Sequence, residues 1–484
     1  MKVEMKIYKI MYYKILGSLL IVASIGGCTP ELAPKVANST VPIEFNSKVQ
    51  GDSLNSANIN WKEFFGDEYL ASMIDTALKY NQELNLFMQE IKIAEAEVKA
   101  RKGEYLPSVN AGLGAGFEKS GQYTRAGAVE ENLEIRPGTE FPEPLPDYQL
   151  GLYASWELDV WKKLRNAKKA SMMRYLSSIE GRNFLVTNLV AEIASTYYEL
   201  IALDNELSII QQNIVVQSQA MEIVKLQKAA ARVTELAVKR FEAQVTGIKS
   251  LEFEVKQEII ETENRLHFLI GRYPEVVSRN SASFEALTTD SVLIGLPSDL
   301  LLNRPDIRKA ELELQAANLD IKAARANFYP SFRITSGLGF QAFNPAYLLT
   351  TPESMMYSLA GDMVAPLVNR NAIKAVYQSA SARQIQTVYD YERSILNAYL
   401  EVVSQSSKIE NLGKSYELKA QQVDALITSV DISANLFRSA RADYMEVLLT
   451  QREALEARFE LIDLKMQQME ARVNIYRSLG GGWQ

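Results

Sequence analysis

Cysteine and histidine each occur only once in this 484-residue sequence, as Cys28 and His267. A lone cysteine excludes a disulfide within the chain, and one residue of each type excludes a Cys/His zinc site. His267 has no partner histidine, so we interpret it as a residue that packs within a helix. The sequence also lacks the GxSxG and HExxH motifs of common hydrolases. These absences predict a protein that is not an enzyme and that has no catalytic residue, metal site or bound cofactor.

The sequence also lacks an excess of positive charge and any long apolar run. The net charge is −7 and the isoelectric point is about 5.3, whereas nucleic-acid-binding proteins usually carry a basic stripe. No uninterrupted apolar run reaches the ~18 residues of a helical membrane span. Any membrane crossing by the mature chain is therefore expected to use β-strands.

The position of the single cysteine is informative. Four lysines precede an apolar run at residues 15–25, and Gly26, Gly27 and Cys28 follow it. This order is typical of a secretory signal peptide, here residues 1–27. A cysteine directly after small residues resembles a bacterial lipobox, which predicts a covalent lipid on Cys28 and a lipidated tether at residues 28–60. The alternative is an ordinary signal peptide in which the cysteine occurs by chance.

Proline is absent from residues 147–273 and 367–484, and glycine is rare there. These two stretches predict long helix pairs at residues 162–271 and 371–480, the second turning near residues 439–443. Helices of this length must bury a seam against a neighbour, because propensity alone does not hold them. A soluble coiled coil would have the same pattern, so the helices alone do not define the fold.

An internal duplication organises the chain into a first repeat at residues 61–275 and a second at 276–484. Up to the first expected strand of each repeat the offset is 223 residues, and from the second strand onward it is 209 residues. The first repeat therefore has a hairpin loop, at residues 118–147, that is 14 residues longer than its counterpart. The matching positions include Pro107 with Pro330, Phe117 with Phe340, Tyr148 with Tyr357 and Gly271 with Gly480.

Four segments alternate between apolar and small or polar residues, as β-strands do. They span about residues 108–117, 148–159, 331–341 and 355–366. Each is about ten residues long, the length of a tilted strand that crosses a bilayer, although a soluble half-buried hairpin would alternate similarly. Four strands cannot close a barrel, for which about eight are needed, so identical chains must share one. A trimer would supply 12 strands, and the strands alone would also allow a dimer or a tetramer.

Several motifs carry a family resemblance. The two specific ones are NRPDI at residues 303–307 and SWELD at 155–159, and WKEF at 61–64 and LPS at 296–298 accompany them. Together they resemble the TolC/OprM-type outer-membrane efflux lipoproteins, over the chain from Cys28 to about residue 480. The resemblance implies an α+β fold: a trimeric 12-stranded transmembrane β-barrel, with four strands per chain, continued by a long periplasmic α-helical barrel.

The resemblance also implies where a gate and a structural motif would lie. The periplasmic turn of the second helix pair would be a tip gate, but Ala440, Ala442 and Leu449 depart from the family pattern there. The structural motif would begin the helix expected at residues 304–328, where proline suits the first turn and an acidic side chain favours the positive helix end. The predicted gate residues are Arg438, Arg441, Asp443 and Glu446, and the predicted structural residues are Arg304, Pro305, Asp306 and Glu311.

The implied function is that of the exit duct of a tripartite, RND-type efflux system in the cell outer membrane. The duct would be lipid-anchored, extend into the periplasm, and passively conduct drugs or other small toxic compounds. Its implied partners are two further copies of the chain, outer-membrane lipid, a periplasmic adaptor (membrane fusion) protein and an inner-membrane RND pump. Alternatives are a duct for heavy-metal efflux or type I protein secretion, or, in a different class, a coiled-coil structural lipoprotein without a channel.

Overall fold

The computed structural model describes residues 32–45, 55–281, 284, 287, 293–368, 370–439 and 441–483. The signal peptide predicted at residues 1–27 and the lipid site at Cys28 lie outside this range. The chain forms two compact units, which we call the sheet unit and the hairpin unit. The sheet unit comprises Met1–Val36, Ile93–Tyr175 and Leu312–Val388, and the hairpin unit comprises Ala37–Lys92, Leu176–Glu311 and Tyr389–Gln484.

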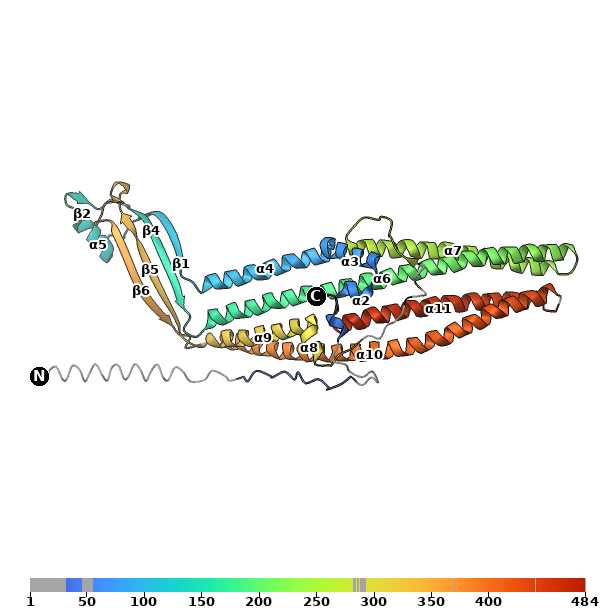
Figure 1. Cartoon of the computed structure of the whole chain (residues 1–484). Coiled ribbons are helices and arrows are strands. Elements are labelled where there is room, and N and C mark those ends of the chain that lie inside the picture. Colours follow the sequence, from blue (N-terminus) through green and yellow to red (C-terminus); the bar gives the residue numbers. More distant parts are fainter. Residues whose placement is uncertain are drawn as a thin grey trace. The chain divides into compact units, whose positions relative to one another are not determined.

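Two pairs of long helices dominate the fold (Figure 1). They are α6 (Lys163–Ala229) with α7 (Glu235–Ile270), and α10 (Asn371–Arg438) with α11 (Tyr444–Ser478). The α6 and α10 helices run for 67 and 68 residues without interruption, because no proline removes a backbone donor within them. Across the described parts of the chain, no helix is both long enough and apolar enough to span a membrane.

Shorter helices precede each long pair. In the first repeat these are α2 (Trp61–Phe65), α3 (Glu68–Tyr80) and α4 (Gln82–Glu104). In the second they are α8 (Asp299–Asn303) and α9 (Pro305–Ala326), so the helix expected at residues 304–328 begins one residue later and ends earlier. The remaining short turns are the 3-10 helices η1 (Ser56–Asn58) and η3 (Pro345–Tyr347).

One antiparallel sheet has four strands in the order β1-β4-β5-β6. Each repeat supplies a hairpin, and β4 pairs with β5 to join the two hairpins. Residues that pair across neighbouring strands form a row, and all side chains of one row point to the same face of the sheet. Leu113, Leu150 and Phe340 form one such row. The strands are β1 (Ser108–Glu118), β4 (Leu145–Leu158), β5 (Ser331–Ala342) and β6 (Met355–Val364).

The longer hairpin loop of the first repeat has secondary structure of its own. It contains α5 (Arg125–Asn132) and a small hairpin of β2 (Glu134–Arg136) and β3 (Thr139–Glu140). The Thr124 side chain accepts a hydrogen bond from Gly127 N at 3.2 Å and so caps α5. The Gly, Pro and Glu content of this segment indicates a loop, and the helix depends instead on the local cap at Thr124.

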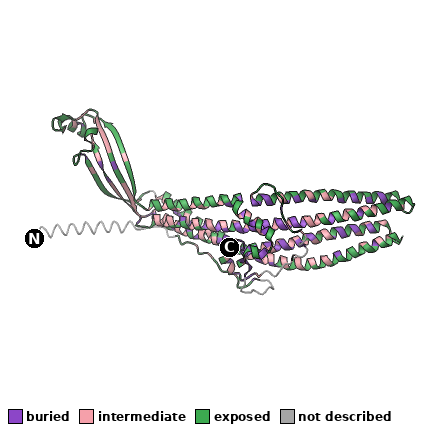
Figure 2. Ribbon diagram, turned by 45° about the horizontal axis from the view of Figure 1, so that its top comes forward, coloured by how far each residue is buried: buried purple, intermediate pink, exposed green. Residues whose placement is uncertain are grey.

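The hydrophobic core of the hairpin unit lies where α6, α7 and α11 meet α2 and α3. Buried residues are concentrated along the long helices (Figure 2). Small and β-branched residues of α6 allow close packing, and large side chains from other helices fill the space between them. The fully buried core residues include Ile74, Ile193, Ala194, Tyr197, Leu266 and Met469.

The tether predicted at residues 28–60 is held along α10 where the structure describes it. In the sheet unit, Lys35 exchanges two hydrogen bonds with the Gln384 side chain: its N–H donates to Oε1 at 3.1 Å and its carbonyl accepts from Nε2 at 2.7 Å. In the hairpin unit, Phe45 stacks on Tyr399 with ring centroids 5.4 Å apart. Residues 32–45 are therefore an extended strap and not a free linker.

Candidate functional site

The two long helix pairs end in turns of the same design. At the end of α6, Arg232 N donates to Gln227 O at 2.9 Å, and at the end of α10, Arg441 N donates to Leu436 O at 2.9 Å. The 209-residue offset of the repeats superposes these two bonds. This bond, from a residue just past the helix to a carbonyl five residues earlier, is the Schellman closure of a helix C-terminus. The duplication therefore extends to the hydrogen bonds of the tip.

All four predicted gate residues lie at the second turn. Arg438 is the last residue of α10, and Arg441 follows in the turn. Asp443 occupies the N-cap position of α11 without making a side-chain capping bond, and Glu446 lies in the first turn of that helix. Each of the four side chains is exposed, and within the described residues none forms an ion pair. Four unpaired charges on one turn are free to meet a neighbouring molecule.

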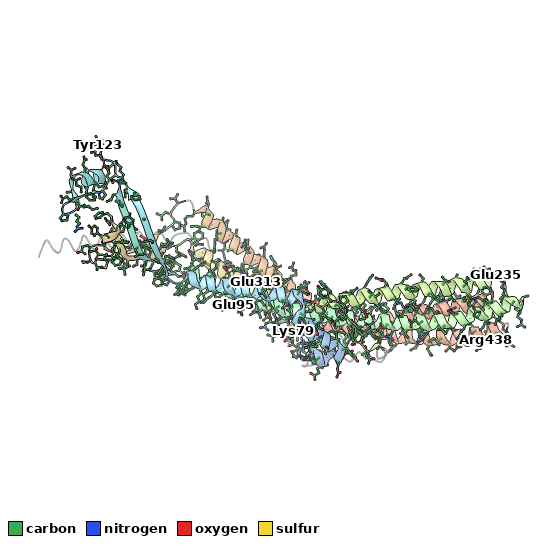
Figure 3. The ribbon with its side chains drawn as sticks, turned by 90° about the horizontal axis from the view of Figure 1, so that it is seen from above. Lys79, Glu95, Tyr123, Glu235, Glu313 and Arg438 are labelled. Carbon is green, nitrogen blue, oxygen red and sulfur yellow. The ribbon has the colours of Figure 1, made fainter. Side chains whose placement is uncertain are left out.

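The first turn is arranged differently, because two of its charges are paired within the chain. Lys228 at the end of α6 forms an ion pair with Glu235 at the start of α7. Glu235 and Arg438 lie toward the same end of the hairpin unit (Figure 3). The two tips therefore differ in electrostatics although they share a backbone design.

Apolar side chains hold the two tips together. Val224 and Phe241, both about 1% exposed, pack with Phe437 and Tyr444 from the second helix pair. Arg240 Nη1 also lies 3.0 Å from the Met445 sulfur. Sequence reasoning did not find this contact, because nothing in the local pattern of α7 or α11 links residues that are 205 positions apart.

Backbone strain marks the first turn. Ala231 has φ of 57°, a left-handed conformation that costs an L-residue with a Cβ roughly 1–2 kcal/mol. Its counterpart under the 209-residue offset is Ala440, which lies outside the described residues. Both turns thus carry alanine at a position whose conformation in the first turn suits glycine.

The predicted structural motif closes a junction between three helices. Arg304 is 5% exposed and donates from Nη1 to Glu401 Oε2 at 2.6 Å and to Ser478 O at 2.9 Å. It also forms a two-pronged pair with Asp306, at 3.0 and 2.7 Å. Burial alone would lower the pKa of Arg304, but the carboxylates of Asp306 and Glu401 raise it. The guanidinium thus remains charged while it ties the start of α9 to α10 and α11.

Two other residues of this motif, Pro305 and Asp306, favour the start of α9. Pro305 is the first residue of α9, where its missing N–H removes no helical bond, and Asp306 lies in the first turn. Glu311 is exposed on α9, and its negative charge, together with burial, raises the pKa of Tyr391.

The second family motif joins strand to helix within the sheet unit. Trp156 Nε1 donates to Tyr105 O at 3.1 Å, and Trp161 Nε1 donates to Pro330 O at 2.8 Å. Asp159 accepts from Leu164 N and Arg165 N at 2.9 Å each, and so caps the start of α6. The SWELD segment therefore fixes the direction in which the chain leaves β4.

His267 is 8% exposed, and its Nε2 lies 3.1 Å from Glu275 N and 2.9 Å from Glu275 O. This contact joins α7 to the segment after it, in agreement with a packing role. Within the described residues, no group of three or more His, Cys, Asp or Glu side chains is placed to hold a metal ion.

The four-stranded sheet has two chemically distinct faces. One face carries apolar residues in every strand and no charged side chain, for example Leu113, Leu152, Leu338 and Leu359. Every charged residue of the four strands points to the other face. Those residues are Glu118, Asp147, Glu157, Arg333 and Asp362. One uncharged apolar face and one acidic face suit a sheet that lies between an apolar and an aqueous environment.

The comparisons with known proteins agree with this interpretation. The family model described as outer membrane efflux protein matches residues 73–272 and 296–481. The cation efflux system protein CusC of Escherichia coli O6:H1 is 27% identical over 95% of this chain and 96% of its own length. The pyoverdine export outer membrane protein OpmQ of Pseudomonas aeruginosa is 26% identical over 95% of each chain. The crystal structure of the open state of the Neisseria gonorrhoeae MtrE outer membrane channel has a TM-score of 0.81 at 22% identity, covering 94% of this chain and 99% of that one.

Because the family model matches most of the chain, the protein belongs to the outer membrane efflux protein family. It is an exit duct of the outer membrane that extends into the periplasm, and the members of its family are channel proteins of tripartite efflux systems. The resemblance to TolC/OprM-type proteins and the α+β class are thus confirmed.

Proposed function

We propose that three copies of this chain form a passive duct that conducts small toxic compounds, and that an adaptor and an inner-membrane RND pump drive the export. The single observation that carries this proposal is the open sheet with one uncharged face. In the described chain, β1 and β6 each pair with only one strand. An unpaired strand edge in lipid costs several kcal/mol for each bare backbone group, so edges in a membrane must be closed by pairing. Pairing β6 of one copy with β1 of the next in a trimer gives a ring of 12 strands.

The cargo class of the proposed duct is inferred from its role as a passive conduit. The named relatives CusC and OpmQ serve cations and pyoverdine by their names, yet their identities to this chain are 27% and 26%. A duct sequence that relates equally to both does not indicate which cargo passes through it. We assign selection to the inner-membrane pump, and drugs or other small toxic compounds as the cargo class, with metal ions and secreted proteins as the alternatives. The duct itself would catalyse no reaction and would hold no cofactor.

A covalent lipid on Cys28 would anchor the duct in addition to the barrel. Only residues 29–31 separate Cys28 from Leu32, whose N–H donates to the Tyr377 hydroxyl at 3.3 Å. Three extended residues reach on the order of 10–14 Å, so the lipid would hold this end of α10 close to the membrane surface. Mass spectrometry of the mature protein would detect the lipid, and Cys28→Ser would remove it.

The oligomeric state and the conductance of the purified mature protein test the duct. We expect a mass of three copies in detergent by native mass spectrometry, and single-channel steps in a planar bilayer. A monomer that gives no current would contradict the proposal, and a coiled-coil lipoprotein without a channel would give that result.

The gate is tested by reversing the free charges of the second tip. We propose that Arg438 and Arg441 hold the tip closed through neighbouring copies, because both are exposed and neither has a partner carboxylate among the described residues. Arg438→Glu and Arg441→Glu should raise the single-channel conductance. The control is Arg393→Glu, an exposed arginine on α10 far from the tip, which should leave the conductance unchanged. If neither tip variant differs from this control, the two arginines do not belong to the gate.

A further inference from the structure

Tyr153 lies flat on the acidic face of the sheet, across glycines of three strands. A Cβ placed on Gly112 of β1 would lie 3.0 Å from Tyr153 Cε2, and one placed on Gly337 of β5 would lie 3.5 Å from Cδ1. A Cβ on Gly151, in the same strand as Tyr153, would lie 3.4 Å from the hydroxyl. The ring is thus in van der Waals contact with the backbone on one side. Only glycine at these positions lets an aromatic ring approach a sheet so closely.

Burial along the strands agrees with this placement. Gly151 and Gly337 are buried and Gly112 is half-buried, whereas Gly114 and Gly116 of the same face are exposed; Gly339 is also buried, against the backbone of β4. Tyr153 itself is 37% exposed. The ring therefore covers the glycines with one side and presents its other side away from the sheet.

The face that bears the ring is negatively charged as a whole, and its charged row nearest to Tyr153 lies four residues along β4 and holds Glu157, Arg333 and Asp362. The acidic face of the four strands bears four carboxylates and one arginine, and the opposite face bears no charge. A surface that carries one sign of charge raises the local concentration of the opposite ion. The negative face of an aromatic ring also attracts cations, and flat aromatic molecules stack on it.

We propose that Tyr153 is a contact site for planar aromatic cations that pass through the duct. This inference rests on the proposed function, because it places the acidic face toward the lumen. In the proposed trimer, three Tyr153 rings would lie at one level of the wall, each supported from behind by glycines. A rigid ring loses little conformational freedom on contact, so it can bind a flat cation weakly and release it, as a conduit requires.

Ethidium is the probe, and its binding to the purified full-length protein in detergent is measured by fluorescence anisotropy. We expect Tyr153→Ala to weaken ethidium binding about tenfold, the loss of one ring contact. Tyr153→Phe keeps the ring and should stay within about twofold of the unaltered protein. The matched control is Tyr357→Ala, because Tyr357 is on strand β6 of the same sheet, is 80% exposed and points to the opposite face.

The same variants are then compared in planar bilayers for block of the current by ethidium. Loss of binding and of block in Tyr153→Ala, with Tyr153→Phe and Tyr357→Ala unaffected, would support the site. Equal binding by Tyr153→Ala and the unaltered protein, or an equal loss in Tyr357→Ala, would overturn it. A protein that binds ethidium through Tyr153 but conducts no current would sustain the contact site and contradict the proposed duct, so the two failures are distinct.

Discussion

The junctions at the bases of the two repeats share one backbone design but use different chemistry. In the first, Gly271 lies against Tyr80 O, and the Asn81 side chain donates to Leu269 O at 2.9 Å. In the second, Gly480 lies against Asn303 O, and the Arg304 side chain donates to Ser478 O at 2.9 Å. The offsets of 223 and 209 residues superpose these partners pair by pair.

The difference lies in what the anchoring side chain does beyond this shared bond. Asn81 is neutral, and its Oδ1 accepts from Leu84 N at 2.8 Å, which caps α4. Arg304 is charged, and it binds Asp306 on α9 and Glu401 on α10. A close backbone approach thus fixes the geometry in both repeats, while the side chain determines how many helices are joined. An asparagine joins two helices, and an arginine joins three.

The largest expected effect tests the shared part of the design. Gly271 and Gly480 have φ of 76° and 93°, and an added Cβ would lie 2.4 and 2.6 Å from a carbonyl oxygen. Gly271→Ala and Gly480→Ala should each destabilise the helices by about 3–4 kcal/mol, from the left-handed backbone plus the steric conflict. The thermal midpoint of the circular dichroism signal at 222 nm in detergent measures this. The control is Gly413→Ala, because Gly413 lies inside α10 with open space around it, and alanine there should stabilise by up to ~1 kcal/mol. Equal midpoints for all three variants would contradict the close-approach explanation.

The second prediction separates the two side chains. Arg304→Ala leaves two carboxylates without their partner and should cost about 3 kcal/mol, whereas Asn81→Ala loses a cap and one hydrogen bond and should cost about 1.5 kcal/mol. Arg393→Ala is the control, because Arg393 is exposed and its ion pair with Asp390 should contribute less than ~1 kcal/mol. The comparison between repeats fails if Asn81→Ala costs as much as Arg304→Ala.

Much of the fold could be predicted from the sequence because two simple signals are strong here. The absence of proline over more than a hundred residues permits helices such as α6 and α10, and the change from a helical to a two-residue period marks β1 and β5. The helix α5 could not be predicted in the same way. Its eight residues have no apolar stripe, and it depends on a local cap at Thr124.

The candidate site could be predicted only where a motif lies within one continuous segment. Arg304 and Pro305 are recognisable from NRPDI, but the contact of Arg304 with Glu401 spans 97 residues. Asn81 was missed although the signal was present, since the 223-residue offset places it on Arg304. The contact between Arg240 and Met445 left no such signal, because it depends on how the tips pack.

The third prediction uses a carboxyl that only the first repeat has. Burial, together with the negative charges of Glu258 and Asp463, raises the pKa of Glu206 on α6 to about 7. The second repeat has Ser415 at the matching position. Since the folded protein holds the Glu206 proton more tightly than the unfolded chain, stability should fall as the pH rises from about 4.5 to about 7.

Glu206→Gln should remove this part of the pH dependence. Because Glu206 is only partly buried, water screens its charge, and we expect the variant to gain about 1 kcal/mol at pH 8 and nothing at pH 4. Thermal midpoints at these two pH values measure the difference. Ser415→Ala is the control from the second repeat and should shift both midpoints equally. A gain by Glu206→Gln that is the same at both pH values would exclude titration of Glu206 as the cause.

The smallest expected effect concerns the strained turn between α6 and α7. Ala231 adopts φ of 57°, and glycine reaches this conformation without a Cβ conflict. Ala231→Gly should therefore stabilise the protein by about 0.5 kcal/mol, once the greater freedom of glycine in the unfolded chain is subtracted. The control is Ala220→Gly, a substitution inside α6 that should destabilise by about 1 kcal/mol. Opposite signs for two chemically identical changes would show that the backbone of the turn, and not the side chain lost, governs the effect. If both variants lose stability, the turn does not hold Ala231 in the left-handed conformation in solution.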